Sequence, residues 1–301
     1  MPTMGNAAPR RARAALLAAG ALCLAGCGRG VLGPQGPVAE AERTLLLNSL
    51  GIMLAIVIPT ILATIAFAWW YRAGNKRAVY DPDFVYSGQV ELVVWAIPAM
   101  VVLLLGGIAW IGSQQLEPSR PLASSVKPVQ VEVVSLDWKW LFIYPEQGVA
   151  SVNRLVIPAG TPVQFQLTSD GVMNSFFVPQ LGSQIYTMSG MVTRLNLQAD
   201  RPGRFAGMSA QYSGDGFADM RFSVDALAPA DFARWAASSR GAGPALDAPA
   251  FAKLAQRSSN VPPTQFGAVD AALFANIVAG RAAAPPPPAV VDGQTQRVGN
   301  R

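Results

Sequence analysis

The sequence predicts a membrane-anchored protein in which a two-helix transmembrane hairpin carries an outer β-sandwich or barrel, followed by short C-terminal helices. Three observations lead to this fold class. Hydrophobic residues make up 51% of the 301-residue chain and charged residues only 14%, a more apolar balance than soluble domains usually show. Two long uncharged segments occur in the N-terminal part. A series of short segments with period-two alternation follows them.

The composition excludes several functions. The chain contains no histidine, which removes Ser-His-Asp and Cys-His catalysis and any haem that this chain would hold through an imidazole. The net charge of +5 is spread along the chain without a basic stripe, so we expect no nucleic-acid partner. Both cysteines lie near the start, so no disulfide framework is predicted for the body of the protein.

Residues 1–26 have the pattern of a secretory signal peptide. Three arginines precede a short apolar run, which ends in Leu24-Ala25-Gly26-Cys27. This ending resembles the lipobox of bacterial lipoproteins, in which cleavage before the cysteine leaves a thiol that receives a lipid. The alternative is ordinary cleavage at small residues, with Cys27 incidental. Residues 27–43 are rich in Gly and Pro at their start and predict a flexible linker.

Residues 44–116 predict the transmembrane hairpin. No charged residue occurs from Thr44 to Tyr71 or from Leu92 to Leu116, and about 20 apolar residues suffice to cross a bilayer. The short connection contains Arg72, Lys76 and Arg77. Because short loops rich in Lys and Arg stay in the cytoplasm, everything after the second span should lie outside.

Residues 117–226 predict one outer β-domain. Its expected strands are rich in β-branched and aromatic residues, and their number and close spacing predict an antiparallel sandwich or barrel. The strands are expected at residues 129–135, 138–144, 153–158, 162–169, 175–179, 193–199 and 220–226. Residues 227–281 predict short amphipathic helices whose aromatic residues pack them on the sandwich or on a partner. The Pro-rich residues 282–301 predict a disordered tail.

Long motifs in this order resemble subunit II of the haem-copper respiratory oxidases. They are "DWKWLFIYP", "IPAGTPVQFQLTS", "VMNSFFVPQLGSQIYTMSG" and "GMSAQYSGDGFADMRF", preceded by the two spans. The resemblance runs from about residue 44 to residue 280. It implies that the outer domain is a cupredoxin-like Greek-key β-sandwich.

In family members that oxidise cytochrome c, this domain holds a binuclear copper centre. The ligands are a His before an "SF-x-VP" segment and the loop Cys-x-Glu-x-Cys-x-x-x-His-x-x-Met. Cysteine thiolates and imidazoles suit copper because they are soft, strong donors. In this sequence the ligand positions are occupied by Asn174, Ser209, Gln211, Ser213, Phe217 and Met220. Only Met220 keeps the family's residue, so the pattern implies that this chain holds no metal or other cofactor.

The branch of the family with this loss is the quinol oxidases of the cytochrome bo type. The resemblance implies a required, non-catalytic subunit of a proton-pumping ubiquinol oxidase in the bacterial cytoplasmic membrane. Quinol would deliver electrons to haem and copper in a partner, subunit I, and further small membrane subunits would complete the complex. The lipoprotein signal also fits that branch.

Glu91 is the candidate for proton uptake. The family has an acidic residue in an "E-x-x-x-W-x-x-P" setting at the mouth of a proton channel into subunit I, and Glu91, Trp95 and Pro98 match that spacing. The alternative is a carboxylate that only anchors the helix at the membrane surface. For Trp138 and Trp140 we expect packing rather than electron transfer.

Three other functions stay open at this point. A menaquinol oxidase subunit would have the same build, since nothing in the chain reads the quinone ring. A lipid-anchored cupredoxin-like binding or assembly protein belongs to a different class, but the missing His and Cys argue against metal handling. A copper-bearing cytochrome c oxidase subunit is disfavoured because five of its six ligand positions are replaced.

Overall fold

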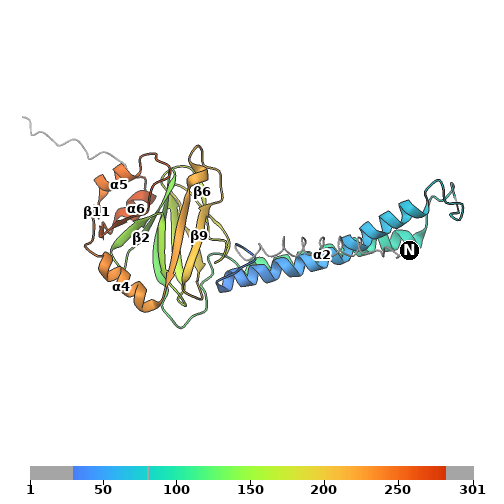
Figure 1. The fold of residues 1–301 in the computed structure, drawn as a ribbon, viewed down its shortest axis with the longest axis horizontal. Coiled ribbons are helices and arrows are strands. Elements are labelled where there is room, and N and C mark those ends of the chain that lie inside the picture. The colour runs from blue at the N-terminus through green and yellow to red at the C-terminus, as the bar shows by residue number, and fades with distance from the viewer. Residues whose placement is uncertain (1–29, 80, 283–301) are drawn as a thin grey trace, which may run out of the picture.

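The computed structural model describes residues 30–79 and 81–282, which form a long helical hairpin attached to a β-sandwich (Figure 1). The predicted signal peptide with Cys27 and the tail from residue 283 onward lie outside the described residues. Ala282, which was assigned to the disordered tail, is described and is buried against the C-terminal helices.

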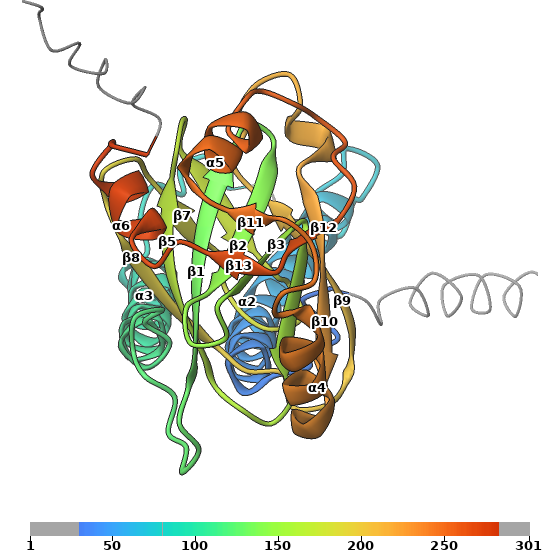
Figure 2. The same ribbon diagram turned by 90° about the vertical axis from the view of Figure 1, so that its left-hand side faces the viewer.

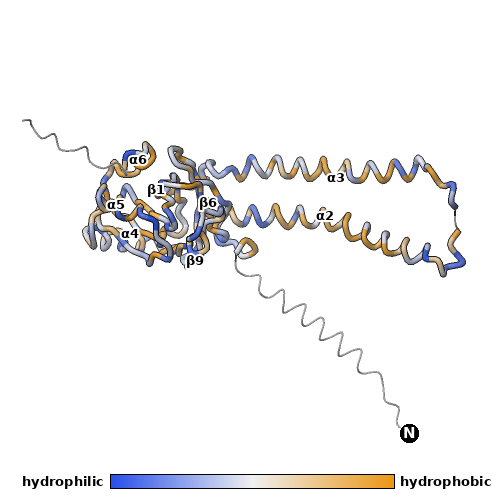
Figure 3. Tube along the Cα trace, turned by 90° about the horizontal axis from the view of Figure 1, so that it is seen from above, coloured by the Kyte–Doolittle hydropathy of each residue, from blue (hydrophilic) through white to orange (hydrophobic). Residues whose placement is uncertain are grey.

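The hairpin consists of α2 (Pro37–Trp70) and α3 (Gly88–Gln115). At 34 and 28 residues and about 1.5 Å per residue, both helices exceed the roughly 30 Å of a bilayer's hydrocarbon core. Figure 3 shows that hydrophobic residues recur along both helices. Their side chains are mostly exposed in this single chain, as expected for surfaces that face lipid or partner helices. Near the sandwich the helices touch at Gly112, where an added Cβ would lie 2.8 Å from Leu45 Cδ2; they diverge toward their far ends.

The prediction of a flexible linker over residues 27–43 was wrong for the part that the structure describes. α2 begins at Pro37, because proline is pre-organised for the first helical turn and the charges of residues 40–43 end the apolar run without ending the helix. The preceding turn is tied to the sandwich, since the Gln35 amide donates to Gln180 O (2.7 Å) and Gln35 O accepts from the Asp200 amide (2.8 Å). The first helix therefore leaves the sandwich at a fixed point.

The sandwich has two main sheets whose strand order is not the sequence order. One sheet has the order β12 (Thr264–Phe266), β3 (Val149–Val152), β2 (Lys139–Tyr144), β1 (Val129–Leu136), β5 (Val163–Ser169), β8 (Thr193–Leu197). The other has the order β4 (Arg154–Pro158), β10 (Arg221–Leu227), β9 (Gly203–Ser209), β6 (Asn174–Phe177), β7 (Ile185–Thr187).

Two pairings correct the expectation of a purely antiparallel sandwich. β1 pairs with β5 in parallel, and β10 pairs with β4 in parallel. A parallel pair needs a crossover, and here each crossover passes through other strands of the sandwich, as in Greek-key folds. The predicted β-sandwich itself is confirmed, whereas β3, β7 and β9 were missed because they are short or rich in Gly and Ser.

The inner faces of the two sheets form one core dominated by aromatic rings. Trp140 and Phe142 of β2 meet Phe176 of β6 and Phe222 of β10, with ring centroids 5.2–6.4 Å apart. All four rings are buried. Contacts of this kind stabilise a core beyond the area that they bury.

The predicted C-terminal helices are present as α4 (Pro229–Ser239), α5 (Ala248–Leu254) and α6 (Leu273–Val278). With the two-residue strands β11 (Ala245–Leu246) and β13 (Ala268–Val269), α5 covers the outer face of β1 and β2, and α6 lies beside β5 of the same sheet (Figure 2). Phe251 and Phe274 fill a second apolar core there, with Val134, Leu136 and Leu141 of the sheet. Phe232 and Trp235 of α4 pack on the main core. The sheet is therefore covered on both faces, which explains why its strands are buried more continuously than period two alone predicts.

Glu132 gives a pH-dependent stability that can be measured. It lies on the outer face of β1, and burial raises its pKa from 4.5 to about 7. Protonation of Glu132 therefore favours the folded state. The contribution of Glu132 to the free energy of unfolding is highest below pH 4.5 and falls as the pH rises through 7. Because the carboxylate stays partly solvated, we expect Glu132→Gln to stabilise the full chain in detergent by only about 1 kcal/mol at pH 8.5 and by almost nothing at pH 4.5.

Urea unfolding followed by tryptophan fluorescence at the two pH values measures the difference. Asp215→Asn removes an exposed carboxylate and serves as the control for the change of charge. An equal gain for Glu132→Gln at pH 4.5 and 8.5 would show that the ionisation of Glu132 does not matter.

Candidate functional site

The six positions of the expected metal cradle gather at one end of the second sheet. Asn174 begins β6, Ser209 ends β9, and Met220 precedes β10. Because β6 and β10 both pair with β9, these ends lie side by side. Gln211, Ser213 and Phe217 lie in the connection between β9 and β10, which contains the short 3₁₀ helix η2 (Phe217–Asp219). The fold therefore brings the six residues into one loop cluster, as a ligand set would require.

Hydrogen bonds between protein groups hold this cluster together. Ser209 Oγ lies 3.0 Å from Asn174 Oδ1 and 3.2 Å from Gln211 O. Ser213 Oγ lies 3.9 Å from the sulfur of Met220, which is buried in the main core. The Ser209 amide donates to Met220 O at 3.0 Å and so joins the two ends of the loop.

The donor set does not fit a copper centre. It offers hydroxyls, two side-chain amides and one thioether, and the Phe217 ring has no lone pair and packs edge-on against Tyr212 with centroids 5.6 Å apart. Two of the hydroxyls are already engaged by protein acceptors. Among the described residues, no group of three or more His, Cys, Asp or Glu side chains is close enough to share a metal ion. The loop keeps the shape of a metal cradle without the soft donors that copper needs.

Trp138 supports the loop from below. Its Nε1–H donates to Ser213 O at 2.8 Å, and its ring lies directly under two glycines of the loop. A Cβ on Gly216 would come within 2.5 Å of the ring, and one on Gly214 within 3.3 Å. Gly214 also has a φ of +104°, which disfavours any side chain. The two glycines are therefore required by close packing and backbone geometry rather than by a metal.

The C-terminal extension fixes Trp138 in turn. The Trp138 amide donates to Ser258 O (3.1 Å), and the Ser258 amide donates to Asp137 O (3.0 Å). Arg257 Nε pairs with Asp137 Oδ2 at 3.0 Å. A structural change in residues 257–258 can therefore affect the loop through the Trp138 side chain.

Lys139 is the buried charge of this contact. Its Nζ donates to Gln256 O (2.8 Å), Ser258 Oγ (2.6 Å) and Asp137 O (3.1 Å). Burial lowers the pKa of Lys139, and the charge of Asp137 opposes this effect. Burial also raises the pKa of Asp170, which the nearby Asp137 charge raises further. Three acceptors satisfy the ammonium, so its burial is tolerated.

Trp140 differs from Trp138 in its environment. It is fully buried among the aromatic rings of the main core, and its Nε1 has no hydrogen-bond partner among the described residues. Its position explains it as a packing residue, which agrees with the expectation from the sequence.

Glu91 lies far from this cluster, in the first turn of α3, at the end of the hairpin that points away from the sandwich (Figure 3). Its carboxylate accepts a hydrogen bond from Trp95 Nε1 at 3.2 Å, and both side chains are exposed. Pro98 follows seven positions after Glu91, so all three residues share one face of the helix. The structure thus contains two separate candidate sites, one in the sandwich and one at the far end of the hairpin.

Sequence reasoning missed the residues that support the cluster. Asp137, Lys139, Arg257 and Ser258 are ordinary polar residues in the sequence, and no spacing connects the first two with the last two. The two glycines of the loop, Gly214 and Gly216, were the available signal, since glycine is favoured where a neighbouring group approaches the backbone closely.

Comparison with known proteins places these features in a family. Residues 131–227 match "Cytochrome C oxidase subunit II, periplasmic domain", and residues 240–280 match "COX Aromatic Rich Motif". The chain is 50% identical to cytochrome bo(3) ubiquinol oxidase subunit 2 of Pseudomonas aeruginosa, over 91% of this chain and 83% of that protein. It is 48% identical to ubiquinol oxidase subunit 2 of Acetobacter aceti (86% and 85%) and 39% identical to quinol oxidase subunit 2 of Bacillus cereus (75% and 78%).

The packing of the loop on Trp138 can be tested with Gly216→Ala. The added methyl group cannot fit 2.5 Å from the indole, so the ring must shift and lose its bond to Ser213 O. Overpacking of this kind costs about 1–3 kcal/mol, so we expect the urea midpoint of the full chain to fall accordingly. Gly74→Ala has no neighbour within 4 Å and serves as the control. A variant as stable as the parent would mean that the indole does not support the loop.

Proposed function

Because this chain belongs to the family of subunit 2 of the cytochrome bo(3) ubiquinol oxidases, we propose that it is the subunit of a ubiquinol oxidase that holds no redox centre itself. The complex would oxidise ubiquinol and reduce oxygen to water. The chain sits in the bacterial inner membrane through its two helices, with the sandwich on the periplasmic side. The 50% identity over 91% of the chain supports the assignment to the quinol branch.

The absence of copper-binding side chains from the loop cluster supports the proposal that electrons do not enter through this chain. A periplasmic copper centre is the route by which copper-bearing relatives take electrons from cytochrome c. The side chains of Asn174, Ser209 and Ser213 form hydrogen bonds with each other and with neighbouring groups. The loop therefore has no redox centre that could accept an electron from cytochrome c. Electrons must then pass from quinol in the membrane to haem and copper in a partner subunit.

The hairpin and the sandwich would have separate tasks in this complex. The exposed apolar faces of α2 and α3 would pack on the helices of subunit I and on further small membrane subunits. The sandwich would cover the periplasmic face of subunit I. The finer proposals, proton pumping and acylation at Cys27, rest on the family resemblance and on the sequence pattern before Cys27.

One purification tests the assignment. We expect the tagged full chain to co-purify with a large haem-bearing membrane subunit, and the complex to oxidise ubiquinol with oxygen. Extraction should yield ubiquinone, the separated chain should give no dicopper EPR signal, and its mass should correspond to a chain that starts at an acylated Cys27.

Each contrary result selects an alternative. Menaquinone in the extract would favour a menaquinol oxidase, and a dicopper signal would favour cytochrome c as the donor. A chain that purifies alone and binds copper would be a binding or assembly protein. A mass without acyl groups would contradict only the lipid anchor.

We further propose that Glu91 passes protons from the cytoplasm toward subunit I. Its exposed carboxylate lies at the start of a membrane helix, where ionisable residues are rare and often belong to proton or ion pathways. We expect Glu91→Gln to lower ubiquinol oxidase turnover by about tenfold, less than the loss of a buried proton-transfer group, because water reaches this exposed position and replaces part of the carboxylate's proton transfer. Glu91→Asp should restore most of the rate.

Two control variants separate proton transfer from a structural role. Trp95→Phe removes the hydrogen bond to Glu91 but keeps the carboxylate, and Asp83→Asn removes an exposed acid from the same side of the membrane. Both should turn over like the parent. If Trp95→Phe slows turnover as much as Glu91→Gln does, Glu91 only anchors the helix.

A further inference from the structure

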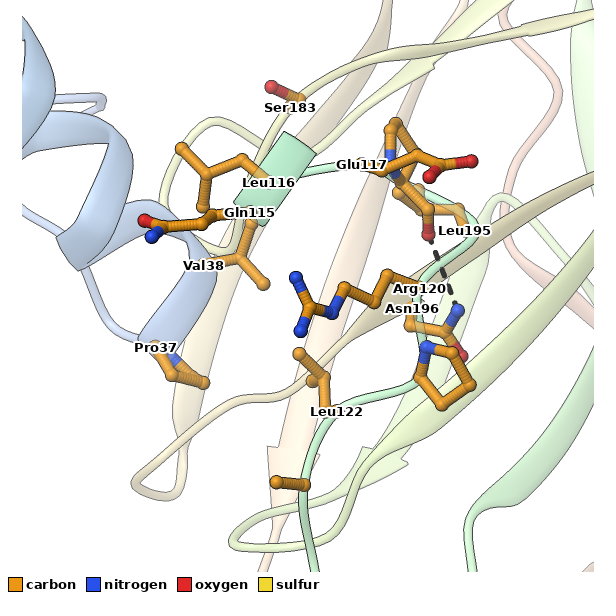
Figure 4. A pocket seen from close by; sticks show the side chains of 13 residues that line it. Pro37, Val38, Gln115, Leu116, Glu117, Arg120, Leu122, Ser183, Leu195 and Asn196 are labelled. Atoms are coloured by element: carbon orange, nitrogen blue, oxygen red, sulfur yellow. Dashed lines mark hydrogen bonds between the residues drawn. The ribbon is translucent and has the colours of Figure 1, made fainter. Parts of the chain in front are cut away.

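A cavity of about 280 Å³ lies where the hairpin joins the sandwich (Figure 4). The first turn of α2, the last turn of α3, the segment after α3, and β8 enclose it. Its volume lies at the lower end for ligand pockets, which usually measure about 300–1,000 Å³. It suits one headgroup and the carbons next to it.

The cavity lies at the level of the lipid headgroups. On α3, the uncharged segment ends at Leu116, and both Gln115 and Leu116 line the cavity. On α2, the uncharged segment begins at Thr44, and the lining residues Pro37 and Val38 lie about 10 Å above it at 1.5 Å per residue. The cavity thus extends from the end of the uncharged segment on α3 to about 10 Å beyond the uncharged segment on α2, and this interval contains the headgroup region, which extends some 5–8 Å beyond the hydrocarbon core.

Arg120 brings an uncompensated positive charge to this cavity. Its guanidinium extends into the space between the two helix ends, whereas the Glu117 side chain points the other way (Figure 4). Glu117 instead accepts a hydrogen bond from Ser119 Oγ at 2.6 Å. Among residues 30–79 and 81–282, no carboxylate lies within 4.0 Å of the Arg120 guanidinium, whose one recorded acceptor is Gln114 O at 3.4 Å.

The backbone around Arg120 is fixed, so the charge is presented in a defined place. The Arg120 amide donates to Glu117 O at 3.0 Å and closes a turn. Asn196 of β8 holds that turn in place. Its backbone amide and its side-chain Nδ2 both donate to Pro118 O, at 3.0 and 3.3 Å, and Nδ2 also donates to Ser119 O at 3.1 Å. Val38, Leu116, Leu122 and Leu195 make one part of the wall apolar, while Ser183, whose hydroxyl bonds the Glu42 carboxylate, adds a polar group on another side.

We propose that this cavity binds the phosphate of an anionic phospholipid from the outer leaflet, with Arg120 as the phosphate ligand. A guanidinium forms paired hydrogen bonds to phosphate oxygens, and the single unpaired positive charge favours a headgroup with net negative charge. The apolar walls receive the glycerol carbons and the start of an acyl chain. The lipid would fill the gap between the membrane and the sandwich at the base of the hairpin.

The test uses the purified full chain with its co-purifying membrane partners in nanodiscs of phosphatidylglycerol and phosphatidylethanolamine. Native mass spectrometry after delipidation counts retained lipids. We expect the parent to retain one phosphatidylglycerol per chain and Arg120→Gln to lose it. Arg43→Gln removes a charge from the same end of α2, but Arg43 pairs with Glu40 at 3.3 Å and does not line the cavity, so this variant should keep the lipid.

Several outcomes would overturn the proposal. Retention of the same phosphatidylglycerol by Arg120→Gln would do so, as would its loss from both variants. A phosphate ion, a quinone or phosphatidylethanolamine in its place would also contradict it. Arg120 is exposed, so its replacement by Gln should not disturb folding, and equal urea midpoints for the parent and both variants verify this. None of these results bears on the assignment as an oxidase subunit.

Discussion

The contact between the Trp138 ring and the loop of residues 213–216 is the interaction on which the periplasmic site depends. Metal ligands normally hold such a loop closed, and none of suitable chemistry is present in it. In this protein the indole of Trp138 stabilises the loop through van der Waals contact with Gly214 and Gly216 and through one hydrogen bond to Ser213 O. The Asn174–Ser209 hydrogen bond closes the loop from the side. The frame is thus kept by packing and neutral hydrogen bonds rather than by metal ligands.

The same contact connects the C-terminal extension to the site. Residues 256–258 hold Asp137, Trp138 and Lys139 through backbone pairing, one ion pair and a buried ammonium with three acceptors. Removing one partner of a buried charge is costlier than removing a surface pair, so these groups must be kept together. The matched aromatic-rich segment, residues 240–280, therefore acts as a support for the sandwich rather than as an appendage.

A second set of contacts fixes the sandwich relative to the membrane. Gln35 and Asn196 tie the chain on either side of the hairpin to the sandwich, and Ser183 Oγ lies 2.5 Å from a Glu42 carboxylate oxygen. Gly36 and Gly182 allow these segments to approach, since a Cβ on Gly36 would lie 2.0 Å from Gln198 O. With both ends held, the hairpin is a rigid extension of the sandwich at its base. The cavity beside Arg120 is a consequence of that junction.

The sequence by itself determined the hairpin, the presence of a β-sandwich, the short C-terminal helices and the lack of metal donors at Asn174, Ser209 and Ser213. These features follow from the local periodicity, from the length of the uncharged segments and from the chemistry of single residues, all of which can be recognised in short stretches of the sequence. Only the tertiary structure decided the parallel pairs β1–β5 and β4–β10, the docked turn before α2, and the support of Trp138 by residues 256–258. Those features join residues that lie between 34 positions apart (Val129 and Val163) and 165 positions apart (Gln35 and Asp200), about an order of magnitude beyond the reach of helix or strand periodicity, so no local pattern encodes them.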